Sequence, residues 1–127
     1  MLKKLLSPAA ALTLCGLSSL ALAADPAKTV DTALGKALAD SQGMTLYTFA
    51  KDAEGKSACN GPCAQNWPPL MAPASAEPGN GYTVITRDDG SRQWAYQGKP
   101  LYTWIKDSKP GDTTGDGVNQ VWHVAKP

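Results

Sequence analysis

The stretches QGMTLYTFAKD, residues 42–52, and QGKPLYTWIKD, residues 97–107, decide how this chain is organised. They align without a gap at an offset of 55 residues (97 minus 42), and seven of their eleven positions are identical. At the same offset Trp67 aligns with Trp122. A match this long, with a second anchor in the same register, predicts two copies of one structural unit of about 55 residues.

Each copy has the residue pattern of short β-strands joined by tight turns. The ten prolines and twelve glycines argue against long helices. The sequence therefore predicts an all-β fold, a small compact domain of two pseudo-symmetric β-hairpin repeats with short helical turns, at about residues 34–71 and 82–127. Strands are expected at residues 36–40, 44–49, 82–87, 91–96, 101–104 and 121–125, with turns at 41–43, 88–90 and 97–100 and a helical turn at 62–66.

The strand motif LYTF, residues 46–49, divides its side chains between two faces, because alternate residues of a strand point in opposite directions. Tyr47 and Phe49 share one face, and the matching LYTW at residues 101–104 divides in the same way. We expect the aromatic face to be the core face, with two further aromatic side chains packed on it, Trp67 and Trp122.

The chain begins with the features of a signal peptide. Lys3 and Lys4 precede an apolar run, and Ala21-Leu22-Ala23 supplies small residues at positions −3 and −1 of a cleavage site. We therefore expect residues 1–23, including Cys15, to be a signal peptide and residues 24–127 to form one periplasmic or secreted domain. The apolar run is too short for a convincing membrane span, so no stable membrane insertion is expected after cleavage.

The charge of the expected mature chain narrows the class of partner. The whole chain has 12 basic and 11 acidic residues, and loss of Lys3 and Lys4 leaves 10 against 11, a formal charge of −1. A near-neutral chain has no basic surface for nucleic acid or for an anionic membrane. The expected partners are an envelope protein or a small ligand, with no nucleic acid.

Several linked motifs resemble a known family, the bacterial secreted repeat of unknown function, also described as predicted lipoproteins with a Tyr-x-(Phe/Trp/Tyr)-x-x-Asp motif. The segment CNGPCAQNWPPL, residues 59–70, and GDTTGDG, residues 111–117, ahead of Trp122-His123 are similar to that family as well. The resemblance implies an exported two-repeat architecture and no established activity. The repeated motif residues are Tyr47, Phe49 and Asp52 in the first copy and Tyr102, Trp104 and Asp107 in the second.

Cys59 and Cys63 flank Asn-Gly-Pro, and this loop has three interpretations. A working dithiol commonly uses a Cys-x-x-Cys spacing, whereas three residues intervene here. A metal site would need further ligands, of which His123, the single histidine, is the candidate. A disulfide that reinforces the loop is the preferred interpretation, because exported cysteines tend to be oxidised and the other copy has Thr114 and Val118 at these positions. The alternative is a periplasmic redox or metal-handling protein that uses Cys59, Cys63 and His123.

The second copy also contains part of a calcium-loop pattern. Asp112, Thr114 and Asp116 fall at positions one, three and five, and Gly117 at position six, but position twelve is His123 in place of glutamate. The same residues form an ordinary Asp/Gly-rich turn, which is the favoured interpretation, and weak calcium binding is the alternative.

Catalytic motifs are absent from the sequence. There is no Gly-x-Ser-x-Gly, phosphate loop, dinucleotide fingerprint or zinc-protease motif. Asp52 and Asp107 suggest an acid/base pair, yet their position after equivalent strands equally suits the building of a corner twice. We therefore expect a non-enzymatic binding or envelope-associated module with no cofactor.

Overall fold

The computed structural model describes residues 25–127, so the expected signal peptide and Cys15 lie outside the described residues. Within residues 25–127, no helix combines the length and the apolar character needed to cross a membrane. The elements along the chain are β1 (Lys28–Thr32), β2 (Gly35–Ala39), β3 (Tyr47–Phe49), α1 (Pro62–Asn66), β4 (Tyr82–Thr86), β5 (Arg92–Tyr96), β6 (Lys99–Pro100), the 3₁₀ helix η2 (Val118–Gln120) and β7 (Trp122–Val124).

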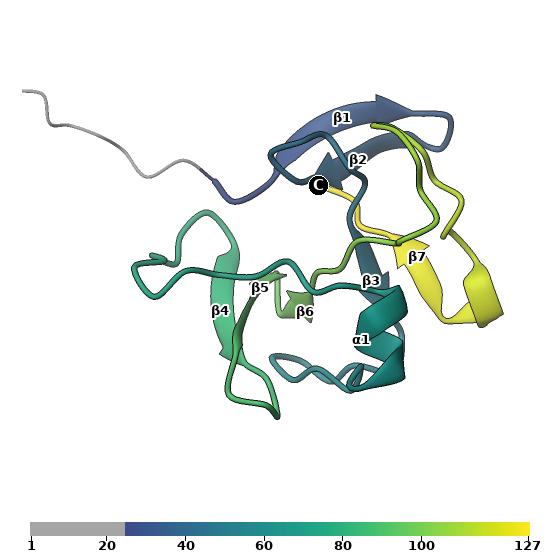
Figure 1. Cartoon of the computed structure of the whole chain (residues 1–127). Coiled ribbons are helices and arrows are strands. Elements are labelled where there is room, and N and C mark those ends of the chain that lie inside the picture. The colour runs from purple at the N-terminus through teal and green to yellow at the C-terminus, as the bar shows by residue number, and fades with distance from the viewer. Residues whose placement is uncertain (1–24) are drawn as a thin grey trace, which may run out of the picture.

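The strands form three small antiparallel sheets (Figure 1). β1 pairs with β2, β3 pairs with β7, and β5 lies between β4 and β6. The short α1, which begins at Pro62, is the one α-helix among the described residues. The prediction of a small all-β domain built from two repeats is confirmed.

Turn chemistry sets the two hairpins of the second repeat. β4 turns into β5 through Asp88, Asp89 and Gly90, where Gly90 has a φ of 87° that favours glycine. β5 turns into β6 through Gln97 and Gly98, which both have positive φ, as a two-residue hairpin turn requires. β1 was not predicted, because Lys28–Thr32 is mostly exposed and carries little apolar pattern.

The partner of the central strand was predicted wrongly. The expected hairpin of residues 36–40 with 44–49 holds near its turn, where Ala39 is bridged to Thr45. Beyond Leu46, however, β3 pairs with β7, which belongs to the other repeat. The reason is that a strand has two edges, and the sequence pattern indicates its faces but not which segment occupies each edge.

The two repeats cross each other in matching ways. The Tyr47 amide donates to the Tyr102 carbonyl at 2.7 Å, and the Tyr102 amide donates back to the Tyr47 carbonyl at 3.0 Å. Further out, the Ala125 amide bonds the Leu46 carbonyl (2.8 Å), and its counterpart 55 residues earlier, the Leu70 amide, bonds the Leu101 carbonyl (2.9 Å). The closing segment of each repeat therefore completes the central strand of the other, about a pseudo-twofold axis between Tyr47 and Tyr102.

Both faces of the central strands are buried, which corrects the expectation that only the aromatic face forms the core. Leu46 and Leu101 are fully buried in one cluster, and Tyr47 and Tyr102 are fully buried in another. We call these clusters the leucine core and the aromatic core. Other members of the leucine core are Leu38, Tyr82 and Trp94, and other members of the aromatic core are Cys59, Trp67, Trp122 and Val124.

Four aromatic rings form a continuous ring stack in the aromatic core, in the order Phe49, Trp122, Trp67, Trp104. The central tryptophans lie 3.8 Å apart between ring centroids and are nearly parallel, at 3°. Phe49 stacks on Trp122 at 4.2 Å, and its counterpart Trp104 stacks on Trp67 at 3.9 Å. Each end ring thus stacks on the tryptophan of the other repeat, so the ring stack joins the repeats as the backbone bonds do.

Candidate functional site

The tyrosines and aspartates of the repeated motif hold the two repeats together. The Tyr47 hydroxyl donates to Asp107 Oδ2 at 2.6 Å, and the Tyr102 hydroxyl donates to Asp52 Oδ2 at 2.7 Å. Each bond crosses between the repeats. Burial, followed in effect by the aspartate acceptor, raises the pKa of Tyr47 well above its ordinary value, and burial likewise raises the pKa of Tyr102. Both phenols therefore stay protonated donors.

The second oxygen of each aspartate closes the loop that follows its strand. Asp52 Oδ1 accepts from the Ala58 amide at 2.7 Å. Asp107 Oδ1 accepts from the Thr114 amide at 3.0 Å and from the Thr114 hydroxyl at 2.6 Å. Every aspartate of the motif is thus engaged by a tyrosine of the other repeat and by a loop of its own, which is the corner-building role.

Cys59 and Cys63 are joined in a disulfide across four residues of sequence separation, with their Cα atoms 5.2 Å apart. Gly61, between them, has a φ of 55°, which lets the chain turn back into α1. Cys59 is fully buried in the aromatic core, and Cys63 packs against that core from outside. The loop matches the expected reinforcing bridge.

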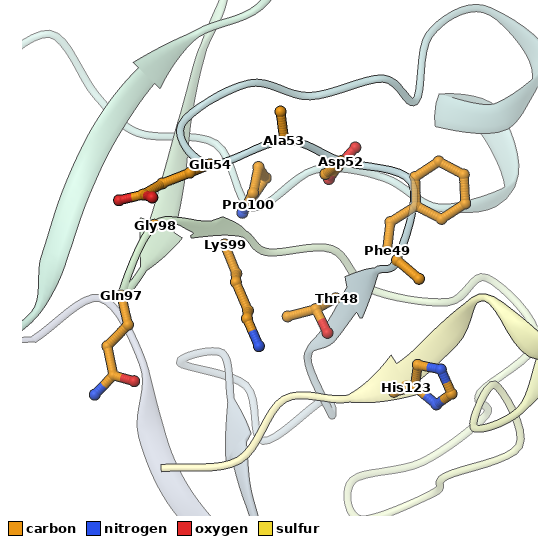
Figure 2. Close-up of a pocket in the computed structure, with 11 residues that line it drawn as sticks. Thr48, Phe49, Asp52, Ala53, Glu54, Gln97, Gly98, Lys99, Pro100 and His123 are labelled. Carbon is orange, nitrogen blue, oxygen red and sulfur yellow. The ribbon is translucent and has the colours of Figure 1, made fainter.

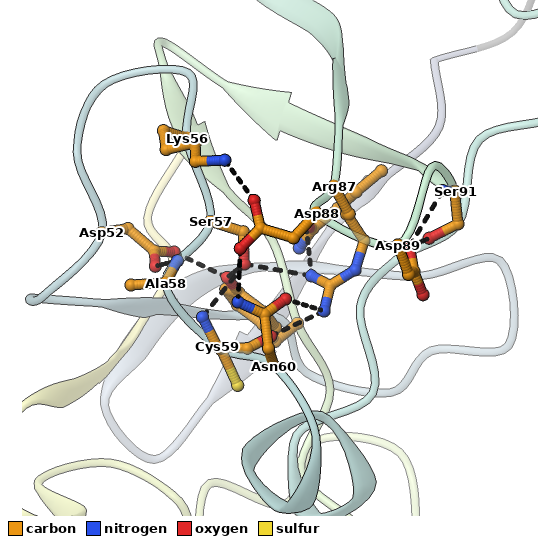
Figure 3. A network of polar contacts seen from close by, with 12 residues as sticks. Asp52, Lys56, Ser57, Ala58, Cys59, Asn60, Arg87, Asp88, Asp89 and Ser91 are labelled. Atoms are coloured by element: carbon orange, nitrogen blue, oxygen red, sulfur yellow. Dashed lines mark hydrogen bonds and ion pairs between the residues drawn. The ribbon is translucent and has the colours of Figure 1, made fainter.

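A buried arginine, Arg87, holds the disulfide loop from the other side (Figure 3). Its Nη1 donates to Ser57 Oγ at 3.0 Å and to Gln93 Oε1 at 2.8 Å, and its Nη2 donates to the Cys59 carbonyl at 2.6 Å. Ser57 Oγ also lies 2.6 Å from the Tyr102 hydroxyl, so this network continues into the crossed tyrosine–aspartate pair. Sequence reasoning missed this role, since Arg87 was only the last residue of an expected strand.

At the exposed edge of the network, Asp88 fastens the same loop to the β4–β5 turn. It accepts from the Lys56 ammonium and from Asn60 Nδ2, the latter at 3.0 Å (Figure 3). The hydrogen bond from Lys56 holds the pKa of Asp88 below its ordinary value. These exposed contacts position the loop and contribute little to stability.

The residues of the calcium-loop pattern are engaged separately. Asp112 Oδ2 accepts from the amides of Ser108 and Lys109, and Asp116 Oδ1 accepts from the Val124 amide at 2.9 Å. Thr114 bonds Asp107, as described above. In the described part of the chain, no three or more His, Cys, Asp and Glu side chains are grouped so that they could hold a metal ion. The structure therefore does not bring Asp112, Thr114, Asp116 and His123 together.

The candidate binding surface is a groove beside β3 and β7 (Figure 2). One hollow of about 420 Å³ lies between the loop that follows β3 and the β5–β6 turn. A second hollow of about 490 Å³ extends toward the end of the chain. The two hollows adjoin at four shared side chains, and we call them together the groove. The shared residues are Thr48, Gln97, Lys99 and His123.

Strand pairing explains why polar groups collect there. Thr48 and His123 are register partners in β3 and β7, and they point away from the aromatic core because their neighbours Tyr47 and Trp122 point into it. The β5–β6 turn brings Gln97 and Lys99 to the same place. His123 was predicted as a site residue, whereas Gln97 and Lys99 were predicted only as part of a turn.

The groove side chains differ from their counterparts in the other repeat. At the offset of 55 residues, Lys99 corresponds to Met44, and His123 corresponds to Pro68. The central tyrosine, the aspartate and the stacking tryptophan, in contrast, are present in both repeats. A position that the fold needs should be filled alike in both repeats, so the fold does not require the lysine or the histidine.

Gln97 is held in an unfavourable backbone conformation. Its φ of 51° lies in the left-handed region, which side chains other than Asn, Asp and Gly seldom adopt. Backbone strain of this kind often occurs at functional sites, and the side chain here lines both hollows of the groove.

Comparison with known proteins gives one family. The profile of a family described as "secreted repeat of unknown function" matches residues 28–71 and again residues 83–126. Together the two matches cover more than half of the chain, and they confirm the family resemblance expected from the sequence. No curated protein and no solved structure matches the chain significantly.

Proposed function

The chain belongs to the family of secreted repeats of unknown function, and from that premise we propose that it is a non-enzymatic binding module of the periplasm or the extracellular space. The groove around Thr48, Gln97, Lys99 and His123 is its binding surface. Its partner is a small ligand in preference to an envelope protein, because the groove is concave and local.

The observation that carries this proposal is the contrast between shared and unshared positions in the two repeats. The residues of the repeated motif build the fold, and they are engaged in bonds inside the molecule. Lys99 and His123 have no such duty, since their counterparts Met44 and Pro68 serve the same corner without a charge. Polar groups that the fold does not need and that gather in a concave surface favour a ligand site.

The non-enzymatic part of the proposal rests on how the acidic and phenolic groups are used. Asp52 and Asp107 each accept hydrogen bonds from a tyrosine and from a loop amide, and both tyrosines are fully protonated. The cysteines are paired with each other, and Cys59 is buried. Acid/base or thiol chemistry would need these groups to be free.

The test is a nuclear magnetic resonance titration of the purified, isotope-labelled secreted protein with a library of small acids, amines and neutral sugars. A binding module predicts that at least one class shifts the signals of Thr48, Gln97, Lys99 and His123 together. The double variant Lys99→Met/His123→Gln should lose that response. Lys106→Met is the matched control, because Lys106 is exposed and does not line the groove. The absence of any groove response, or a response centred elsewhere, would rule the proposal out.

A further inference from the structure

We infer that the groove binds a small ring-bearing acid, whose acidic group lies between Lys99 and His123 and whose ring lies on Phe49. This inference rests on the proposed binding function and adds the chemical class of the ligand. Three features of the groove carry it: two cationic or donor side chains at one place, negative charge confined to the other end, and an aromatic ring with a free face.

The acid-binding end is formed by three side chains that gather around one point. In Figure 2, Thr48 lies between the Lys99 ammonium, which reaches toward it, and the His123 ring. Within residues 25–127, neither Lys99 Nζ nor the His123 ring has a hydrogen-bond or ion-pair partner, whereas other lysines of the chain bind aspartates. An ammonium, an imidazole and a hydroxyl together offer the donors that a carboxylate or phosphate accepts.

Acidic residues line the same groove, but they do not compete for this point. Asp52 is engaged by the Tyr102 hydroxyl and the Ala58 amide. Glu54 lies against Gly98, at the opposite end of the groove from His123 (Figure 2). The groove is therefore positive at one end and negative at the other, which orients a ligand with its acidic group toward His123.

The ring-binding end is the outer face of Phe49. This residue ends the ring stack, so one face of its ring is covered by Trp122 and no aromatic ring covers the other. Phe49 is only partly buried, lines the groove, and appears face-on in Figure 2 at the same end as His123. An aromatic or sugar ring placed there would extend the stack by one member.

Gln97 adds a polar contact for ring substituents. Its amide both donates and accepts hydrogen bonds, and asparagine would suit its left-handed backbone better but reach less far. A glutamine retained at this strained position is consistent with a ligand contact that needs its length.

The experiment measures the binding of four probes to the purified secreted protein by nuclear magnetic resonance titration. Benzoate carries both a ring and an acid, glucuronate carries a sugar ring and an acid, acetate carries only the acid, and benzyl alcohol carries only the ring. We expect benzoate or glucuronate to bind at least about tenfold more tightly than acetate and than benzyl alcohol. The stronger of the two identifies an aromatic acid or a sugar acid.

Two variants assign the halves of the ligand to their residues. Lys99→Met should weaken binding of the acids about tenfold and leave benzyl alcohol unchanged. Phe49→Leu should remove the advantage of a ring-bearing acid over acetate. Trp104→Leu is the matched control, because it shortens the other end of the ring stack without touching the groove, and it should keep that advantage.

The outcomes separate the ligand class from the binding function. If neutral or basic compounds of the library shift the groove signals while the acids do not, the ligand class is wrong and the proposed function stands. If Lys99→Met leaves acid binding intact, the placement of the acidic group is wrong. If no compound of any class shifts the groove signals, both proposals fall.

Discussion

At the scale of single residues, the motif Tyr-x-aromatic-x-x-Asp couples two distant parts of the chain through short hydrogen bonds. The tyrosine donates across to the aspartate of the other repeat, and the aspartate closes its own loop with its second oxygen. Because both partners are largely removed from water, loss of either leaves a buried polar group without its partner, which costs about 1–3 kcal/mol.

Asp52 gives this coupling a predictable dependence on pH. Burial outweighs the hydrogen bonds from Ala58 and Tyr102 and raises the pKa of Asp52 above its ordinary value of 3.8. The folded state therefore holds this proton more tightly than the unfolded state. Between 3.8 and the raised native pKa the unfolded state has already released it, so the contribution of Asp52 to stability falls as pH rises through that window.

Urea unfolding of the protein and of Asp52→Asn, compared from pH 3 to pH 7, checks this sign. The stability advantage of aspartate over asparagine should be largest below pH 3.8 and should shrink as pH rises. An advantage that grows with pH would contradict the burial argument.

Gly115 is a second residue whose role follows from its surroundings. A Cβ atom at this position would lie 2.9 Å from ring atoms of both Trp67 and Tyr47 and 3.0 Å from Trp104. Gly115→Ala should therefore force the rings apart and destabilise the protein by about 1–3 kcal/mol. Gly79→Ala is the control, since no atom lies within 4 Å of its Cβ position and its φ is not positive. Denaturant unfolding that gives equal losses for the two would show that the rings move at no cost.

At the scale of elements, the disulfide loop and its counterpart in the second repeat solve one problem in two ways. Cys59 and Cys63 are linked covalently, whereas at the matching positions Thr114 bonds Asp107 and Val118 packs against the aromatic core. Arg87 and Asp88 fasten only the first of these loops.

Replacing the cysteines by their counterparts tests whether the bridge is reinforcement alone. The variant Cys59→Thr/Cys63→Val should fold and lose about 2 kcal/mol of unfolding free energy, the entropy that a bridge of this loop length removes from the unfolded chain. Urea unfolding monitored by circular dichroism measures the loss. A variant that does not fold would mean that the bridge defines the loop, and an unchanged stability would mean that Arg87 alone holds it.

The elements also mark how far the sequence predicts the structure. Local signals sufficed for α1 at residues 62–66, for the β4–β5 turn and for the bridge between Cys59 and Cys63, because each depends on neighbours in the chain. The pairing of β3 with β7, the role of Arg87 and the groove were beyond it. Each of these depends on contacts between residues more than 25 positions apart, and a repeat that contains two tyrosines and two aspartates does not say which tyrosine meets which aspartate.

At the scale of the whole molecule, the repeats are interlocked and not stacked end to end. The closing segment of each repeat pairs with the central strand of the other, and the ring stack alternates between them. Neither repeat can complete its own sheet or its own half of the aromatic core. The cooperative folding unit is therefore the pair.

A cut between the repeats tests this interlocking. A protease site inserted between Ala74 and Ser75, both exposed, divides the chain outside both repeats, and the disulfide lies wholly in the first half. After cleavage the two halves should elute together in gel filtration at the mass of the intact protein and separate only in denaturant. The cut protein should unfold at lower denaturant concentration at high dilution, because the connection no longer supplies the effective concentration. Halves that separate without denaturant would contradict the interlocked arrangement.

The crossed pairing of the repeats also bears on how such a chain arises. Two copies that complete each other's sheets have the arrangement of a dimer with exchanged strands, and residues 72–82 need only join the end of one subunit to the start of the next. In an identical pair every mutation appears twice, so a new side chain alters both sides of the axis at once. Once the copies are fused, each side can change alone. The disulfide on one repeat and the lysine and histidine brought to one groove are changes of that kind, and they make a single-sided protein from a symmetric plan.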